Sequence, residues 1–117
     1  MGKFFKLIES FSQPLSPEVA SPVLWGDMAV IEDRLKDDFD HIEFGRDTMF
    51  APTMSPAHML KLFEKNAGPL ATLVKALADD PPKLSNLRNA VLKLIENFFS
   101  NNFLRQDFLM TRCIKKV

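Results

Sequence analysis

Few side chains in this sequence have the types and spacings that chemistry requires. The two histidines, His41 and His58, lie far apart, and neither has a histidine, cysteine or carboxylate at a metal-ligand spacing. Cys113 is the only cysteine, which excludes an internal disulfide and favours a small buried side chain over a nucleophile. Glu43 and Asp47 fall on the expected wet face of a strand. The sequence therefore predicts neither a metal site nor a catalytic residue.

The sequence contains candidate residues for the binding of an apolar molecule. The only tryptophan, Trp25, stands in the segment SPVLWGD of residues 21–27, which has neither helix nor strand periodicity. It either packs beneath a neighbouring layer, the commoner arrangement, or lines an acceptor pocket. Methionine side chains adapt to irregular apolar pockets as well as to cores. The methionines that are candidates for lining such a pocket are Met28, Met49, Met54 and Met59.

Composition limits the size and class of the protein. The 117 residues, 46% of them hydrophobic, suffice for one domain with one core. The sequence has neither an apolar run of membrane-spanning length nor an apolar signal region, so we expect no membrane contact and a cytoplasmic location. The formal net charge is +0, which argues against a nucleic-acid partner.

The charges are unevenly distributed along the chain. Residues 1–58 hold five Lys and Arg against ten Asp and Glu, and residues 59–117 hold ten against five. One interpretation is that the two halves attract each other across a single fold. The other is a basic face that meets an acidic partner.

Helical periodicity predicts about five helices in a mostly helical α+β fold. The first covers the first dozen residues, and Pro14, Pro17 and Pro22 then exclude regular structure through Ser21. Asp27 and Ser55 are expected N-caps, and Asn101-Asn102 stops the longest helix. The expected core-facing residues are Phe4, Phe5, Ile8, Phe11, Met28, Ile31, Leu35, Met59, Leu60, Phe63, Leu70, Leu73, Val74, Leu77, Leu84, Leu87, Val91, Leu94, Ile95 and Phe98.

Two segments alternate as strands do. In residues 42–50 the inner side carries Ile42, Phe44, Thr48 and Phe50, and Gly45 indicates a bulge or a close backbone approach. Residues 108–114 are apolar on both sides, which is typical of a strand with covered faces and neighbours on both edges. A pair of strands alone is marginally stable in water, so we expect a missing neighbour.

The order of these segments resembles the C-terminal part of class I S-adenosylmethionine-dependent methyltransferases of the small-molecule type. The resemblance covers nearly the whole chain and is carried by SPVLWGD, the strand HIEFGRDTMF and the helix opening SPAHMLKLFEKNAGPL. It implies a closing antiparallel strand pair that is part of a Rossmann-like sheet. Ala57 and Ala67 depart from the helical motif; the residues that match it are Ser55, Pro56, His58, Phe63, Gly68 and Pro69.

The cofactor-binding half of that family is missing from this sequence. The family places a glycine-rich turn after its first strand, whereas the four glycines here lie too far apart to form one. The resemblance therefore implies that residues 1–117 form a single domain with an incomplete methyltransferase-like fold. Alone it is expected to bind no cofactor and to take S-adenosylmethionine only if an N-terminal half completes it.

Two functions stay open at this point. In the first, the chain supplies the substrate-side cap and closing strands of a methyltransferase and is not catalytic alone. In the second, it is a non-enzymatic dimerisation or small apolar ligand-binding module on the same scaffold. Both predict an open edge on the last strand, closed by a homodimer, a complementary methyltransferase half or strands exchanged between copies. The candidate substrate pocket is Trp25, Met49, Met54, His58 and Phe63.

Overall fold

The computed structural model describes residues 2–12 and 21–117 and confirms an α+β fold. Pro14 and Pro17, expected to exclude regular structure, lie outside the described residues. The described residues form five α-helices, one short 3-10 helix and one antiparallel sheet. The elements are α1 (Gly2–Phe11), η1 (Pro22–Gly26), α2 (Met28–Leu35), β1 (Phe39–Pro52), α3 (Pro56–Asn66), α4 (Gly68–Ala76), α5 (Pro81–Phe98), β2 (Phe99–Ser100) and β3 (Phe103–Lys115).

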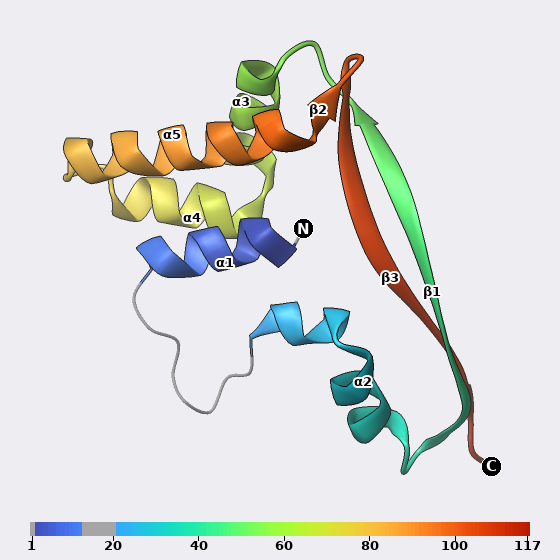
Figure 1. The fold of residues 1–117 in the computed structure, drawn as a ribbon. Helices are drawn as coiled ribbons and strands as arrows, with labels where there is room; N and C mark the ends of the chain where they lie inside the picture. Colours follow the sequence, from blue (N-terminus) through green and yellow to red (C-terminus); the bar gives the residue numbers. More distant parts are fainter. Residues whose placement is uncertain (1, 13–20) are drawn as a thin grey trace.

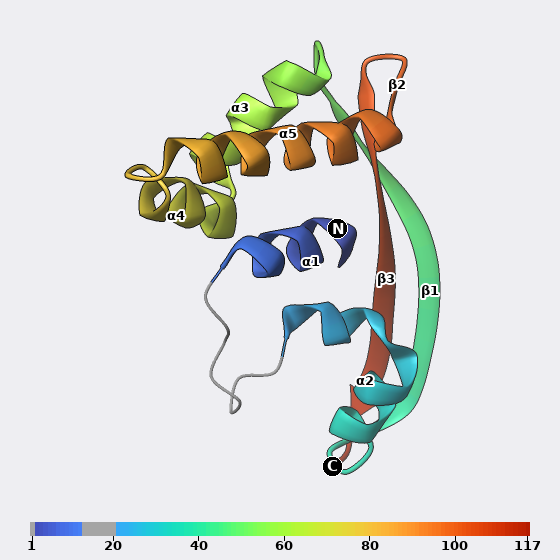
Figure 2. The same ribbon diagram turned by 60° about the vertical axis from the view of Figure 1, so that its left-hand side comes forward.

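The core lies almost entirely among helices. Figure 1 shows α5, α4 and α1 side by side with α3 beside them, and Figure 2 shows the same group after rotation. Leu87 and Val91 of α5 are both 0% exposed at its centre. The apolar stripes of these helices converge as their periodicity predicts. The buried cluster is Phe4, Ile8, Met59, Leu70, Leu73, Leu77, Leu87, Val91, Ile95 and Leu104.

Side-chain caps begin three of the α-helices, as the sequence predicts for two of them. The Asp27 carboxylate accepts from Ala29 N–H at 2.9 Å, and Ser55 Oγ accepts from His58 N–H at 3.1 Å. Asp80, expected only as part of a connector, caps α5. Each cap satisfies a backbone donor that has no partner within its helix.

Helix α2 buries fewer of its apolar side chains than its sequence predicts. Ile31 is buried at 1% exposure, but Met28, expected to face inward, is 44% exposed. Helix α2 touches η1 and β1 and takes no part in the main helical cluster. Ile31 is therefore the one fully buried residue of α2, and Val30 and Leu35 are half-buried beside it.

The strands are longer than the alternation indicates. β1 and β3 pair antiparallel from Phe39↔Lys115 to Pro52↔Phe103, and the short β2 pairs only with the first two residues of β3. The strand order is β1-β3-β2. Phe50, expected on the covered side, is 58% exposed, because its neighbour Ala51 is the residue that packs against the helical core and successive side chains of a strand point to opposite faces.

The irregularity in β1 lies earlier than expected. The register shifts between Asp40 and Glu43, where His41 has a φ of 50°. Gly45 pairs regularly with Met110, and a Cβ added there would meet only the Met110 methyl at 3.9 Å. The expectation of a bulge or close approach at Gly45 is therefore wrong, since the bulge falls where β1 leaves the α2 connection.

Asn101 and Asn102 form the turn between β2 and β3. Their φ values are 49° and 62°, the left-handed pair that a two-residue type I′ hairpin requires. The sequence marked them as the stop of α5, which ends earlier at Phe98. The two asparagines therefore reverse the chain so that β3 can leave alongside β2.

Replacing Asn102 by glycine is expected to stabilise the protein by about 0.5–1 kcal/mol, because glycine adopts a left-handed conformation without a Cβ clash and Asn-Gly is the favoured type I′ pair. The Asn102 carbonyl that accepts from Thr53 N–H is retained in this variant. Urea unfolding measures the difference. A loss of stability of that size would show that the Asn102 side chain contributes more than its backbone strain costs.

The β1–β3 ribbon gives the molecule an extended outline. The radius of gyration is 16.9 Å, against about 13 Å for a compact domain of this length. In Figures 1 and 2 the ribbon runs well past the helical group and reaches α2 at its far end. Much of the ribbon therefore lacks a covering layer within the described part of the chain.

Two ion pairs on the ribbon join the acidic and basic halves of the sequence. Arg112 Nε donates to Glu43 Oε2 at 3.2 Å, and Lys116 Nζ lies 3.9 Å from Asp40 Oδ1. The hydrogen bond and charge of Arg112 lower the pKa of Glu43. These contacts fit the interpretation in which the two halves attract each other.

Candidate functional site

The structure divides the five expected pocket residues among three places. Trp25 and Met49 line one hollow, between η1 and the ribbon. Phe63 lines a second, between α1, α5 and β3. Met54 and His58 lie where β1 turns into α3, and Met54 is 75% exposed. The structure thus brings Trp25 and Met49 together at one hollow and Met54 and His58 together at one turn, and it leaves Phe63 apart from both pairs.

Trp25 is not buried beneath a layer of this chain. Its side chain is 54% exposed, and the guanidinium of Arg34 lies 4.8 Å from the ring centroid. Two local backbone bonds, Leu24 N–H to Ser21 and Asp27 N–H to Leu24, hold η1 in its turn. The favoured interpretation of a packed tryptophan is wrong for the described chain, since η1 presents the ring to Arg34 and to an open hollow of about 510 Å³.

His58 takes part in the structure of a turn. Thr53, buried at 6% exposure, places its Oγ1 3.0 Å from His58 Nδ1 and 3.2 Å from the Ser55 carbonyl. Met54 N–H also donates to Nδ1, at 3.4 Å. Because Nδ1 is engaged as an acceptor, a neutral His58 carries its proton on Nε2. The ring therefore fastens the start of α3 rather than facing a pocket.

Replacing Thr53 by valine is expected to destabilise the protein by about 1–2 kcal/mol, because the change removes the one hydroxyl proton that the part-buried Ser55 carbonyl and His58 Nδ1 share. Urea unfolding measures this loss. Thr53→Ser keeps the hydroxyl and is the matched control, with a smaller expected loss. Equal stability of the valine variant and the wild type would contradict the role of this hydroxyl.

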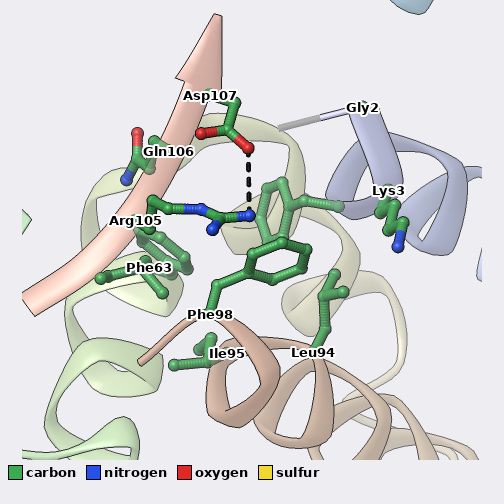
Figure 3. Close-up of a pocket in the computed structure, with 11 residues that line it drawn as sticks. Gly2, Lys3, Phe63, Leu94, Ile95, Phe98, Arg105, Gln106 and Asp107 are labelled. Atoms are coloured by element: carbon green, nitrogen blue, oxygen red, sulfur yellow. Dashed lines mark ion pairs between the residues drawn. The ribbon is translucent and has the colours of Figure 1, made fainter. Parts of the chain in front are cut away.

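The second hollow is an apolar pocket of about 420 Å³ where four elements meet. Its walls come from α1, α3, α5 and β3, and Figure 3 shows the rings of Phe63 and Phe98 turned toward it. The rings of Phe4 and Phe63 lie 5.2 Å apart, centroid to centroid. The lining residues are Gly2, Lys3, Phe4, Phe63, Leu94, Ile95, Phe98, Leu104, Arg105, Gln106 and Asp107.

Two cations stand at this apolar pocket. Lys3 Nζ lies 5.5 Å and Arg105 Cζ 5.6 Å from the centroid of the Phe98 ring. Arg105 also pairs with Asp107, Nη2 to Oδ2 at 3.3 Å, drawn as a dashed line in Figure 3. Among the described residues Lys3 forms no ion pair. The described part of the chain therefore supplies a carboxylate partner to one of these two cations, Arg105.

Sequence reasoning found one of the residues of this pocket as a site residue. Phe63 was expected in a pocket, whereas Phe4 and Phe98 were expected only in the core. Lys3 and Arg105 are more than a hundred positions apart and carry no shared motif. They reach the same ring only because α1 and β3 both pack against α5, which ends at Phe98.

Within the described part of the chain, the outer edge of β3 pairs with no other strand along most of its length. Thr53 N–H donates to the Asn102 carbonyl at 2.9 Å, which fixes which residues of the β1–β3 register exchange hydrogen bonds. Because backbone directions alternate along a strand, Leu104, Gln106, Phe108 and Met110 point toward β1. The backbone N–H and C=O groups that point to the other edge are consequently those of Arg105, Asp107, Leu109 and Thr111. β2 reaches only Phe103 and Leu104 on that side.

Apolar side chains are exposed along the same ribbon. They come from both strands and from both sides of the sheet, as their alternation in the register shows. Exposed apolar side chains next to an open strand edge indicate an interaction surface. These exposed residues are Met49, Phe50, Phe103, Phe108, Met110 and Ile114.

Comparisons with protein-family models, with curated proteins and with solved structures gave no match. Residues 2–12 and 21–117 contain no group of three or more His, Cys, Asp or Glu that would hold a metal ion. None of their helices combines the length and the apolar character needed to cross a membrane. Cys113 is free and half-buried in β3. The open strand edge and the apolar pocket are therefore the two features on which a function can be argued.

Proposed function

We propose that the chain is the substrate-side part of an S-adenosylmethionine-dependent methyltransferase of the small-molecule type. The observation that carries the proposal is the edge of β3 beyond Leu104, which directs unpaired backbone groups outward between uncovered apolar faces. In the family that the sequence resembles, the last strand lies between two neighbours. β3 has one long neighbour, β1, and the position for the other is open.

A strand added beside β3 would satisfy this edge and extend the ribbon into a Rossmann-like sheet. Arg105, Asp107, Leu109 and Thr111 supply the backbone donors and acceptors for it. The elements that pack on the face of the extended sheet would cover side chains such as Met110, which is 58% exposed. Burial of apolar surface and pairing of backbone groups then act together to hold the two parts.

The residues of this chain do not fit S-adenosylmethionine by themselves. Its glycines lie in separate elements, and none of those described has a positive φ. The described glycines therefore form no turn that would let the backbone approach the cofactor closely. The cofactor therefore belongs to the complementary half, on the same polypeptide or on another, and this chain contributes the closing strands and the acceptor side.

A second candidate function is a non-enzymatic dimerisation module. Two copies related by a two-fold axis can pair β3 with β3 antiparallel, which gives a four-stranded sheet with β1 at each outer edge. The same open edge favours this candidate. It differs from the first in needing no cofactor half.

Titration with S-adenosylmethionine tests the first proposal. The chain alone is expected to give no binding up to millimolar cofactor, and binding is expected once the half that carries the glycine-rich turn is joined or added. That half is sought as coding sequence upstream of Met1 or in a neighbouring reading frame. Micromolar binding by the chain alone would overturn the proposal, and absence of any such half would favour the dimerisation module.

A further inference from the structure

We propose that the pocket between α1, α5 and β3 binds a small molecule with an aromatic body and a single carboxylate. The binding site is argued from this chain alone. That the bound molecule is the methyl acceptor rests on the function proposed above. The sequence placed the acceptor near Trp25, Met49, Met54, His58 and Phe63, and of these only Phe63 lines this pocket.

The pocket has the size and lining for the apolar body. Its volume of about 420 Å³ lies in the range of small-molecule sites, about 300–1,000 Å³. Phe4, Phe63 and Phe98 come from three different helices and present ring surface to one space. Aromatic rings stack or meet edge to face at centroid separations such as the 5.2 Å between Phe4 and Phe63. The pocket therefore favours a flat aromatic ligand over a flexible polar one.

The charged side chains at the pocket determine which charge the ligand's polar group should carry. Lys3 and Arg105 lie near the Phe98 ring, so a cationic guest would meet two like charges where it would otherwise use the ring. Asp107 offsets Arg105 in part, and its Oδ1 also accepts from Thr48 at 2.8 Å. Among residues 2–12 and 21–117, no carboxylate forms an ion pair with Lys3. The net field therefore favours an anion.

The backbone at the same place adds to this preference. Gly2, Lys3 and Phe4 are the first residues of α1, and all three line the pocket. The N–H groups of a first helical turn have no acceptor within the helix. A carboxylate beside Lys3 would thus lie at the positive end of the α1 dipole.

Binding of naphthalene-2-carboxylate to the chain, followed by NMR, tests the proposal. The neutral naphthalene-2-carboxamide is the matched ligand, and the carboxylate is expected to bind about 5- to 30-fold more tightly. Shifts are expected at the methyl groups of Leu94, Ile95 and Leu104. The indole N–H of Trp25 reports the other hollow and is expected not to move.

Lys3→Gln is the decisive variant, because Lys3 is exposed and its removal leaves the core intact. It is expected to weaken carboxylate binding about 2- to 5-fold and to leave carboxamide binding unchanged. Lys6→Gln is the control, since Lys6 lies on the same helix, is exposed and does not line the pocket.

Several results would overturn the proposal. They are no binding at millimolar carboxylate, equal affinity for the two ligands, equal effects of the two lysine variants, or shifts confined to Trp25. None of them bears on S-adenosylmethionine binding by the completed protein. A failure here is therefore distinguishable from a failure of the proposed function.

Discussion

Replacing Thr111 by proline is expected to leave the chain folded and to weaken its self-association through β3. The N–H of Thr111 points away from β1, so its loss removes no bond of the β1–β3 ladder, and proline is tolerated on an edge facing solvent. In a two-fold dimer of the proline variant, each copy lacks one N–H and leaves one backbone acceptor of its partner unsatisfied. Each unsatisfied acceptor costs about 1–3 kcal/mol of association free energy. Association is thus expected to weaken about 30- to 10⁴-fold.

Light scattering over a range of concentrations measures this effect. Thr111→Val, which keeps the outward N–H, is expected to associate as the wild type does. Met110→Pro is the opposite control, because Met110 pairs with Gly45 and its N–H points into the ladder, so it should lower stability instead. If the wild type is a monomer at high concentration, or if Thr111→Pro still associates, the edge of β3 does not join copies of the chain.

Replacing Leu87 by alanine is expected to lower the free energy of unfolding by about 2–5 kcal/mol. Leu87 is 0% exposed and belongs to the cluster shared by α1, α3, α4 and α5. The substitution loses transfer free energy and leaves a cavity that rigid helix packing fills only in part. Such a loss is a large fraction of the stability of a domain of this size.

Urea unfolding followed by circular dichroism gives the difference. Lys93→Ala, an exposed position on the same helix, is expected to change stability by no more than about 0.5 kcal/mol. An effect of Leu87→Ala no larger than this control would mean that the helical cluster is not the stable core. The two Discussion predictions separate the parts of the fold, since the first acts on association and the second on the helices.

Local sequence patterns predicted most of the elements because they depend on neighbours along the chain. Asp27 and Ser55 cap helices by contacts within three residues, and the stripe on α5 is visible in its own spacing. The α+β class and the core positions Leu87 and Val91 follow from the same periodicity. Strand alternation found β1 and β3 but gave them too short, because pairing with the partner extends a strand beyond its own apolar pattern.

Where distant residues must meet, the sequence gave weaker guidance. Gly45 suggested a bulge from residue type alone, but the bulge is set by how β1 leaves α2 and falls at His41. Trp25 suggested burial from its size, yet burial needs a covering layer, and none of the described elements provides one. Asn101-Asn102 was read as a helix stop, and its second role as a hairpin turn depends on β2 and β3 pairing.

The sequence by itself determined the helices, the two long strands and the expectation that the last strand lacks a neighbour. These follow from periodicities of 3.6 and 2 residues and from the marginal stability of a lone strand pair. Only the tertiary structure decided that Lys3 and Arg105 flank Phe98, and that the outward backbone groups of β3 are those of Arg105, Asp107, Leu109 and Thr111. Register and helix packing join residues that are far apart in sequence, and no local pattern encodes such a meeting.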